Sequence, residues 1–237
     1  MRDRLSVLAV GAHPDDLELL CGGTLAKYAK LGHEVTMCHV LNGDLGHFHI
    51  PRKELAATRA REAEEAGKLI GARVVNLDIS DLGIYPTEEI KLKVMDVIRL
   101  AKPDVIITHP PNDYMPDHTI ASQVVFDASF MASLPQLESE HEFHPKVTPI
   151  YYMDSLAGCD FLPTDYVDVT DTMELKRQML ARHESQVTWM KEHDHIDFLD
   201  FMETQAKFRG YQCGVKYAEG FRKCETYLRN LPMRMLP

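Results

Sequence analysis

Two short stretches of this sequence concentrate the side chains that bind metals and transfer protons. The first, HPDDLE, spans residues 13–18 and places one histidine and three acids within six positions. The second, NDYMPDH, spans residues 112–118 and ends in an aspartate and a histidine. Histidine nitrogens and carboxylate oxygens are common ligands of catalytic zinc, which keeps one position open for water. The two stretches therefore predict a metal site, provided that the fold brings them together.

Three of these residues suit the metal and two suit the acid–base chemistry beside it. His13, Asp16 and His118 make a set of two histidines and one carboxylate. Zinc held in this way lowers the pKa of its water from 15.7 to about 7. Asp15 is adjacent to a ligand without being needed as one, so it is the candidate general base. Asp117 could accept the second ring N–H of a ligand histidine, or orient Asp15.

A simpler interpretation explains part of the same pattern. An acidic residue after His13 could cap a helix, and Glu18 would then favour the helix dipole. One acidic cap is common at such a position. It does not explain a histidine and three acids that are matched by a second polar stretch, so the two stretches together favour a metal site.

Apolar, β-branched segments alternate with segments of helical periodicity along the chain. This alternation predicts an α/β fold, a Rossmann-like three-layer sandwich with a mainly parallel sheet of strand order 3-2-1-4-5. The predicted strands lie at residues 5–10, 34–41, 73–77, 104–108, 149–155 and 166–169. The predicted helices lie at residues 17–31 (ended by Gly32), 53–70 (ended by Gly71), 87–100, 119–133 and 172–190 (capped by Thr170 or Asp171), with helix and loop thereafter.

The predicted strand order makes the first and fourth strands neighbours whose chains leave in opposite directions. Ligands of such sheets bind in the crevice outside the carboxyl ends of the strands at this switch point. HPDDLE follows the first strand and NDYMPDH follows the fourth. The active site is therefore predicted at the carboxyl ends of strands 1 and 4. No repeat or linker interrupts the pattern, so residues 1–237 are predicted to form a single domain.

Composition narrows the class of protein. The formal charge of -10 argues against nucleic acid or an anionic membrane surface as partner, and no apolar run is long enough for membrane insertion. Five scattered cysteines without a C-x-x-C pair indicate reduced thiols and a cytoplasmic protein. The sequence contains no G-x-G-x-x-G after the first strand and no G-x-S-x-G, which argues against a nucleotide-binding module and a serine hydrolase.

Further motifs follow in order along nearly all of the 237 residues. Together with the two polar stretches, they resemble the PIG-L/LmbE family of zinc-dependent N-acetylglucosamine deacetylases. This family includes enzymes of the bacillithiol and mycothiol pathways. GAHPDDLE looks like the signature of that family, and MPDH resembles its second motif, H-x-D-H. The further matches are RARE at 59–62, DLG at 81–83, HESQ at 183–186 and YAEGF at 217–221.

The resemblance implies a role for each matching residue. His13, Asp16 and His118 would bind zinc, and Asp15 would be the general base. Arg59 matches an arginine that contacts the sugar or the acyl group. The implied reaction is hydrolysis of an N-acetyl group on a small-molecule amino sugar or glycoside. The ligand set also tolerates other divalent ions. Relatives of this family often form trimers or hexamers, which implies a homo-oligomer.

One position departs from the family pattern. Met115 stands where H-x-D-H begins with a histidine that supports the oxyanion and the leaving group. A thioether is only a weak acceptor, and loss of one oxyanion donor costs about 10²–10³-fold in turnover. His109, at the end of the fourth strand, could supply the missing group, or the metal and Asp15 could suffice. The alternative is a zinc-dependent carbohydrate-binding pseudoenzyme with little turnover.

The loops around the predicted site supply candidate substrate contacts. Asp44 and His47 lie after the second strand, on the predicted rim, and are candidate substrate-binding residues. A tight turn would also explain Asp44, and solvation would explain His47. The apolar series around Trp189 and Phe198 is expected to be core or an oligomer interface, with a lid over the substrate as the alternative.

Overall fold

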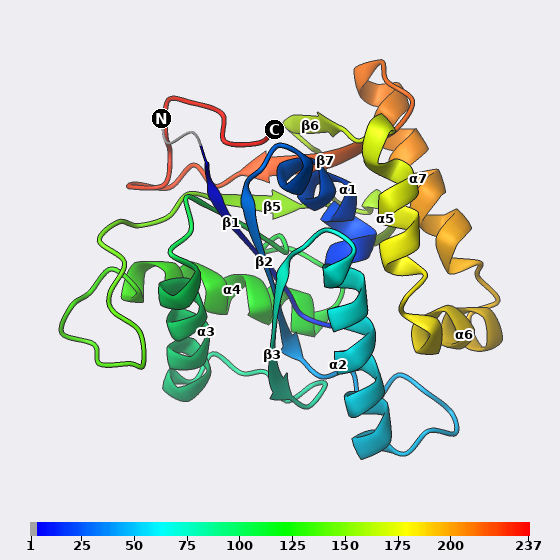
Figure 1. The fold of residues 1–237 in the computed structure, drawn as a ribbon, viewed down its shortest axis with the longest axis horizontal. Helices are drawn as coiled ribbons and strands as arrows, with labels where there is room; N and C mark the ends of the chain where they lie inside the picture. Colours follow the sequence, from blue (N-terminus) through cyan, green and yellow to red (C-terminus); the bar gives the residue numbers. More distant parts are fainter. Residues whose placement is uncertain (1–3) are drawn as a thin grey trace.

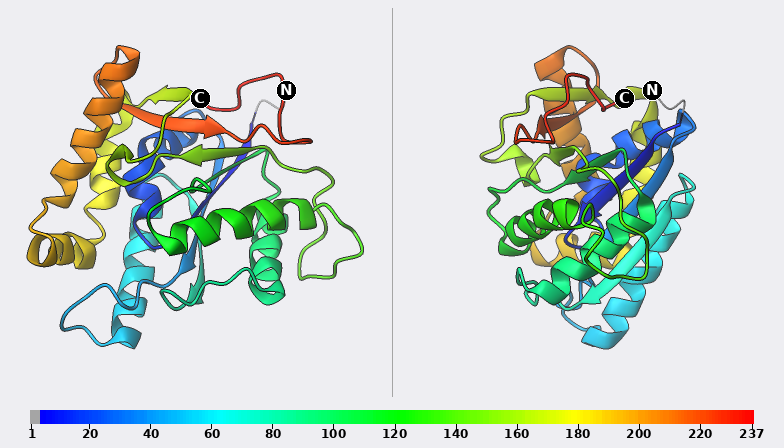
Figure 2. Two further views of the ribbon diagram at one scale, coloured as in Figure 1. Left: turned by 180° about the vertical axis from the view of Figure 1, so that it is seen from behind. Right: turned by 90° about the vertical axis from the view of Figure 1, so that its left-hand side faces the viewer.

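The computed structural model describes residues 4–237 and has a seven-stranded sheet with helices on both faces (Figures 1 and 2). The strand order is β3-β2-β1-β4-β5-β7-β6; the first five strands are parallel, and β7 is antiparallel to both of its neighbours. The predicted three-layer α/β fold and the order 3-2-1-4-5 are confirmed. The strands are β1 (Ser6–Gly11), β2 (Glu34–Leu41), β3 (Arg73–Ile79), β4 (Val105–Thr108), β5 (Ile150–Met153), β6 (Asp165–Asp168) and β7 (Ala218–Lys223).

Two apolar clusters, one on each face, hold the helices to the sheet. Side chains of α3 and α4 pack on one face, and side chains of α1, α2, α5 and α7 pack on the other. Alternate residues of β1 serve the two clusters, which is why this central strand is apolar throughout. The helices are α1 (Asp16–Lys30), α2 (Arg52–Lys68), α3 (Glu88–Ala101), α4 (Pro116–Met131), α5 (Met173–Leu180), α6 (Glu184–His193) and α7 (Phe198–Cys213).

Helix α4 begins earlier than the sequence predicts, and this moves two site residues. The predicted start was residue 119, whereas the helix begins with Pro116 in its first turn. Proline suits this position because its missing N–H would have no partner there. Asp117 and His118 therefore lie on the first helical turn rather than in the preceding loop.

The predicted single helix over 172–190 is wrong. The chain forms two helices, α5 and α6, and neither Thr170 nor Asp171 caps α5 by a side-chain hydrogen bond; residues Thr170–Thr172 form a short 3₁₀ turn instead. The start of α6 is held by Glu62 of α2, whose carboxylate accepts hydrogen bonds from Ser185 N (2.9 Å) and Ser185 Oγ (2.6 Å). The hydrogen bonds from Ser185 to Glu62 thus stabilise the start of a new helix where the local sequence shows no break.

The expectation that the C-terminal segment is only helix and loop is also wrong, because β7 inserts between β5 and β6. Its Glu219 is 4% exposed and pairs with Lys176, with 2.5 Å between Nζ and Oε1. The same carboxylate accepts hydrogen bonds from the backbone N–H groups of Gly23 (2.8 Å) and Thr24 (2.7 Å) in α1. Glu219 therefore ties three elements together beneath the first helix.

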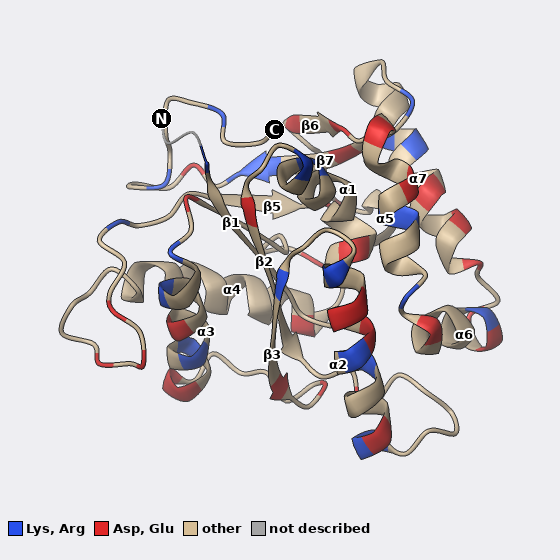
Figure 3. Cartoon of the chain, in the orientation of Figure 1, with Lys and Arg blue, Asp and Glu red and all other residues tan. Residues whose placement is uncertain are grey.

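Figure 3 shows acidic and basic residues interspersed along the outer helices α2 and α3. All five cysteines are free thiols. In residues 4–237, no helix combines the length and the apolar character that crossing a membrane would require.

Candidate active site

The two polar stretches meet at the carboxyl ends of β1 and β4. The strands pair in parallel, with Val10 opposite Thr108, so the residues that follow them leave the sheet side by side. The ring centroids of His13 and His118 lie 5.5 Å apart. The switch point between the strands therefore brings together residues that are more than one hundred positions apart in the sequence.

Three side chains form a compact cluster of possible metal ligands. One nitrogen or oxygen atom from each of His13, Asp16 and His118 lies within 4.8 Å of the others. The Asp16 carboxylate lies between the rings, with 3.4 Å from Oδ2 to His13 Nδ1 and 3.3 Å from Oδ1 to His118 Nε2. The backbone N–H of His13 donates to Asp16 Oδ2 at 2.6 Å and fixes the carboxylate in this position.

Each histidine of the cluster has a second carboxylate on its far ring nitrogen. His13 Nε2 lies 3.2 Å from Asp117 Oδ2, and His118 Nδ1 lies 3.3 Å from Asp113 Oδ2. These neighbours favour a proton on the far nitrogen, which leaves the near nitrogen free to ligate. Asp117 was expected in this role, whereas no signal in the sequence singled out Asp113 among the other polar residues of its stretch.

The cluster fits the zinc ion that the family resemblance implies. His118 Nε2 is buried and has no hydrogen-bond partner within the described chain, although it faces a carboxylate. Burial alone would lower the pKa of His13, but the Asp117 and Asp16 carboxylates raise it to about 10. This excess of negative charge suits a dication, and two imidazoles with one carboxylate are a donor set that zinc accepts.

Asp15 lies beside the cluster in an unusual backbone conformation. Its φ is 122°, a region that costs an aspartate free energy and is found mostly at functional sites. Burial raises the pKa of Asp15 to about 6, against the opposing effect of the Arg59 guanidinium. Arg59 Nη2 lies 3.2 Å from Asp15 Oδ1. The strained backbone and the ion pair hold this carboxylate next to Asp16 without making it a member of the ligand cluster.

Arg59 lines the cavity beside the cluster and is held in place by partners of its own. It is 3% exposed and donates to the carbonyl oxygens of Pro14 (2.5 Å) and Gly43 (3.3 Å), besides pairing with Asp15. Gly43 has φ of +72°, and a Cβ there would lie 2.3 Å from the guanidinium. The turn predicted at 42–44 therefore needs glycine so that Arg59 can approach the loop.

His109 is placed as a support beneath the cluster. It is fully buried, its Nε2 accepts a hydrogen bond from the Ala12 N–H at 3.0 Å, and its ring stacks on His118 at 3.9 Å. Burial, followed by the charge of His118, lowers its pKa to about 4. His109 does not line the cavity beside the cluster, so nothing in this arrangement presents it to a substrate.

A cavity of 640 Å³ opens beside the ligand cluster. Met115 lines it, but Asp44 and His47, both predicted to bind substrate, do not. Asp44 instead pairs with Arg52 at 2.7 Å, and His47 Nδ1 accepts hydrogen bonds from backbone N–H groups of its own loop. The polar side chains that line the cavity include His13, Asp15, Asp16, Arg59, Asp81, Tyr114, His118, Gln186 and Asp194.

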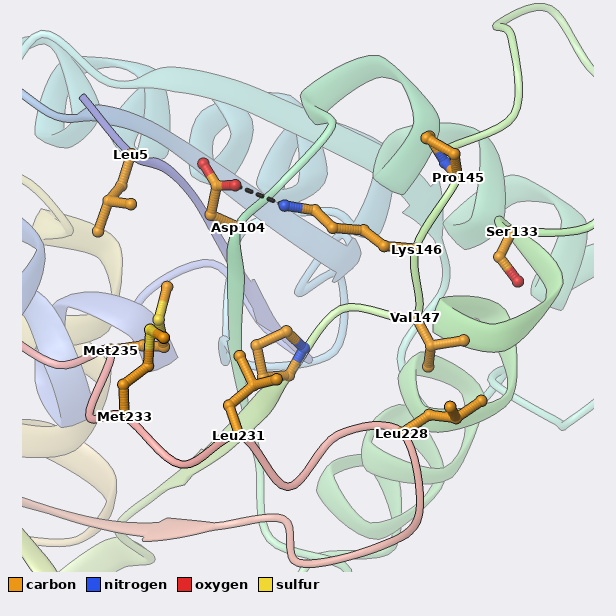
Figure 4. A pocket seen from close by; sticks show the side chains of 11 residues that line it. Leu5, Asp104, Ser133, Pro145, Lys146, Val147, Leu228, Leu231, Met233 and Met235 are labelled. Carbon is orange, nitrogen blue, oxygen red and sulfur yellow. Dashed lines mark hydrogen bonds and ion pairs between the residues drawn. The ribbon is translucent and has the colours of Figure 1, made fainter. Parts of the chain in front are cut away.

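A second cavity, of 680 Å³, lies at the opposite edge of the sheet, near the amino ends of β1 and β4 (Figure 4). Its lining is mainly apolar, and Asp104 and Lys146 form an ion pair across 2.5 Å. Within residues 4–237, none of the side-chain groups able to hold a metal lines this cavity. The chemistry suggested by the sequence is therefore confined to the cavity at the carboxyl ends.

The Asp113→Asn variant is expected to weaken metal binding by about 10–100-fold while leaving the fold intact. An amide cannot stabilise the required tautomer of His118 as a carboxylate does, and loss of such outer partners has this cost. Titration of the metal-free protein with zinc, followed by a competing chelator dye, measures the change. An unchanged affinity would show that Asp113 does not orient the ligand. Asp165→Asn, in the distant strand β6, is the matched control.

Comparison with known proteins places this site in a family. The family model described as PIG-L, GlcNAc-PI de-N-acetylase, matches residues 8–129, just over half of the chain. Diacetylchitobiose deacetylase of Thermococcus kodakarensis is 27% identical over 239 residues, which cover 93% of this chain and 83% of that protein. 4-Oxalmesaconate hydratase of Pseudomonas putida is 23% identical over 181 residues, 72% of this chain and 70% of that protein.

Solved structures agree with the sequence comparisons. N,N'-diacetylchitobiose deacetylase from Pyrococcus horikoshii matches with a TM-score of 0.80 and 27% identity, covering 94% of this chain and 84% of that one. The 4-carboxy-2-hydroxymuconate hydratase of Pseudomonas putida shares the fold, with a TM-score of 0.80 at 22% identity. These relatives are enzymes, and they lend no support to the alternative of a binding protein without turnover. The resemblance seen in the motifs is thus confirmed, and the chain belongs to the PIG-L family.

Proposed function

We propose that this protein is a metal-dependent hydrolase that removes the N-acetyl group from an amino sugar or glycoside, with zinc as the metal. One observation carries the proposal: a cavity-lining cluster of two histidines and one aspartate lies beside Asp15, a buried carboxylate that the cluster does not need. The deacetylase relatives supply the class of reaction.

The chain's own residues provide the proton transfer. His13, Asp16 and His118 would hold the metal, which when bound supplies Lewis acidity toward water and the acetyl carbonyl. Asp15 would accept the proton of the attacking water, because it lines the cavity and Arg59 holds it in place. The amide nitrogen must gain a proton as the carbon–nitrogen bond breaks, and protonated Asp15 can return the proton that it took.

Met115 leaves the oxyanion without the histidine donor of the family motif. We propose that His109 does not replace it in this arrangement, because His109 does not line the cavity and its Nε2 faces Asp16 Oδ2 at 3.2 Å. Four side chains with N–H or O–H groups line the cavity away from the ligand cluster: Arg59, Tyr114, Gln186 and Trp189. We propose that one of these donors stabilises the oxyanion, beside the positive charge that a bound metal would supply.

Hydration of an unsaturated carboxylate, the reaction named for one relative, fits the cavity less well. An anionic substrate needs cationic side chains, and Arg59 is the only lysine or arginine among the described residues of the lining. Arg59 already pairs with Asp15, while Asp81 and Asp194 add negative charge to the walls. A neutral acetamide avoids this repulsion, which favours deacetylation.

The test is acetate release by metal-loaded protein from a panel of N-acetylated amino sugars and glycosides. We expect release that stops after chelation and returns with zinc. No release from any member of the panel by fully loaded protein would refute the proposal. Met115→His, tested in parallel, gains about 10²–10³-fold in turnover if the missing donor limits the reaction. An unchanged rate would show that a cavity-lining donor already replaces it.

Three further expectations belong to this proposal. One continuous sheet carries all the described strands, which supports a single domain. The five free cysteines support a reducing compartment, so we place the enzyme in the cytoplasm. A homo-oligomer, trimer or hexamer, remains a prediction from the family resemblance. Size-exclusion chromatography with light scattering measures this directly.

A further inference from the structure

One wall of the active-site cavity is apolar and comes from a single stretch of the chain. The segment from α6 to the start of α7 places aromatic and aliphatic side chains along the cavity that His13 and Asp15 also line; α6 and α7 are neighbouring elements at the side of the sheet (Figure 1). The lining side chains of this wall are Trp189, Met190, Ile196, Phe198 and Phe201.

Two polar side chains at the margin of this wall each have a partner for one of their atoms. Gln186 Nε2 donates to the Gly46 carbonyl at 3.2 Å, and Asp194 Oδ1 lies 2.8 Å from His193 Nδ1. A sugar hydroxyl placed against the apolar side chains of the wall would lose its bonds to water and gain few in exchange, which weakens binding. The wall therefore suits an apolar group better than a second sugar ring.

Aromatic contacts within the protein hold Trp189, a side chain of the wall, in place. The Trp189 ring stacks on His193, with centroids 4.3 Å apart and planes at 16°, and Phe48 from the loop after β2 packs on Trp189 at 4.6 Å. Aromatic surfaces held in this way lose little conformational freedom when they bind a ligand. The cavity volume of 640 Å³ also leaves room beyond one acetamido sugar.

We propose that this wall binds an apolar substituent, an alkyl or aryl group, carried by the N-acylated amino sugar. The proposal rests on the deacetylase function proposed above and specifies its substrate class. The substituent is either the aglycone on the anomeric oxygen or the end of an acyl chain longer than acetyl. Both present the same chemistry to the wall, and the experiment separates them.

The single tryptophan of the chain makes binding measurable without turnover. Trp189 is the only tryptophan, so all tryptophan emission reports on the wall. The probes are methyl and butyl glycosides of N-acetylglucosamine for the aglycone position, and N-acetyl- and N-butanoylglucosamine for the acyl position. We expect the butyl or the butanoyl compound to bind about 10–50-fold more tightly than its shorter partner, with a change in emission. Equal dissociation constants in both pairs would overturn the proposal.

Variants connect the preference to the wall. Phe201→Ala is expected to reduce the preference for the longer compound to less than about threefold, and Tyr211→Ala, an 82%-exposed position on the same helix, should leave it unchanged. If Phe201→Ala does not fold, Ile196→Ser in the segment between α6 and α7 tests the same contact. A preference that survives both wall variants would refute the assignment.

Two further outcomes are distinct. A preference for the butyl or butanoyl compound, without release of acetate or butanoate from any substrate, would contradict the proposed reaction but not the binding site. Brisk acetate release without any preference for the longer compounds would contradict the proposed binding site but support the proposed reaction. A change of Trp189 emission on dilution of the protein alone would assign the wall to a contact between copies and overturn the substrate proposal.

Discussion

Asp15→Asn lowers the turnover number by about 10²–10⁴-fold, the range that a positioned general base contributes. The substitution keeps the size of the side chain and removes its capacity to accept a proton. Asp15 is not one of the three clustered ligands, so the variant should bind metal as well as the parent does. Steady-state kinetics on the best acetylated substrate, with elemental analysis of the same preparation, measure both quantities.

The matched control is Asp200→Asn, the same chemical change at an exposed position of α7 that does not line the cavity. It should have parental turnover. Retention of parental turnover by Asp15→Asn would refute its role as base. Loss of metal by this variant would instead show that Asp15 is a ligand, and the division of roles between Asp15 and Asp16 would be wrong.

Glu219→Gln is expected to lower the free energy of unfolding by about 3–5 kcal/mol, because it leaves a buried ammonium without its counter-charge. Lys176 and Glu219 are 2% and 4% exposed, so water cannot replace the lost partner. The amide would also meet two backbone N–H donors from α1 with only one acceptor oxygen. Urea denaturation measures the effect as a shift of the midpoint at constant slope.

The double variant Glu219→Gln with Lys176→Met tests the cause of this loss. Removing both charges should recover most of the stability, since an apolar side chain of similar length replaces the stranded ammonium. Glu89→Gln breaks an exposed pair with Lys93 in α3 and should cost about 0.5 kcal/mol or less. A comparable, small loss from Glu219→Gln would show that the buried pair contributes little.

Local sequence signals were sufficient for the central sheet and for the meeting of the two polar stretches. Gly32 and Gly71, with φ of +83° and +66°, end α1 and α2 where the pattern predicts. The alternation of apolar strands and helices then leaves few possible orders for a parallel sheet. Once β1 and β4 are neighbours, the convergence of His13 and His118 follows from the topology.

The parts that the sequence did not reveal depend on partners far along the chain. The break between α5 and α6 is stabilised by Glu62, more than one hundred residues away. The pairing of β7 with β5 and β6 joins segments that no local pattern links. Asp44 was a candidate substrate-binding residue, with a tight turn as the alternative, and it pairs with Arg52 at the start of α2.

The role of Asp113 in the site also could not be predicted from the local sequence. Its nearness to His118 depends on α4 beginning at Pro116, because that turn points the ring back toward the preceding loop. A start three residues later, as the periodicity predicted, would have given no reason to connect the two side chains. Helix boundaries are the least certain element of such a prediction, and here one boundary decides a residue's role.

Helix α2 supports both the reacting carboxylate and the start of the helix that carries the apolar wall. Arg59, which steadies Asp15, and Glu62, which anchors the first residues of α6, lie three positions apart on the same side of this helix. A small sliding or rotation of α2 would therefore disturb proton transfer and substrate choice together. Mutations that broaden the range of accepted molecules by shifting this helix should lower the reaction rate as well, so new specificities would arise more readily through changes in the α6–α7 side chains themselves.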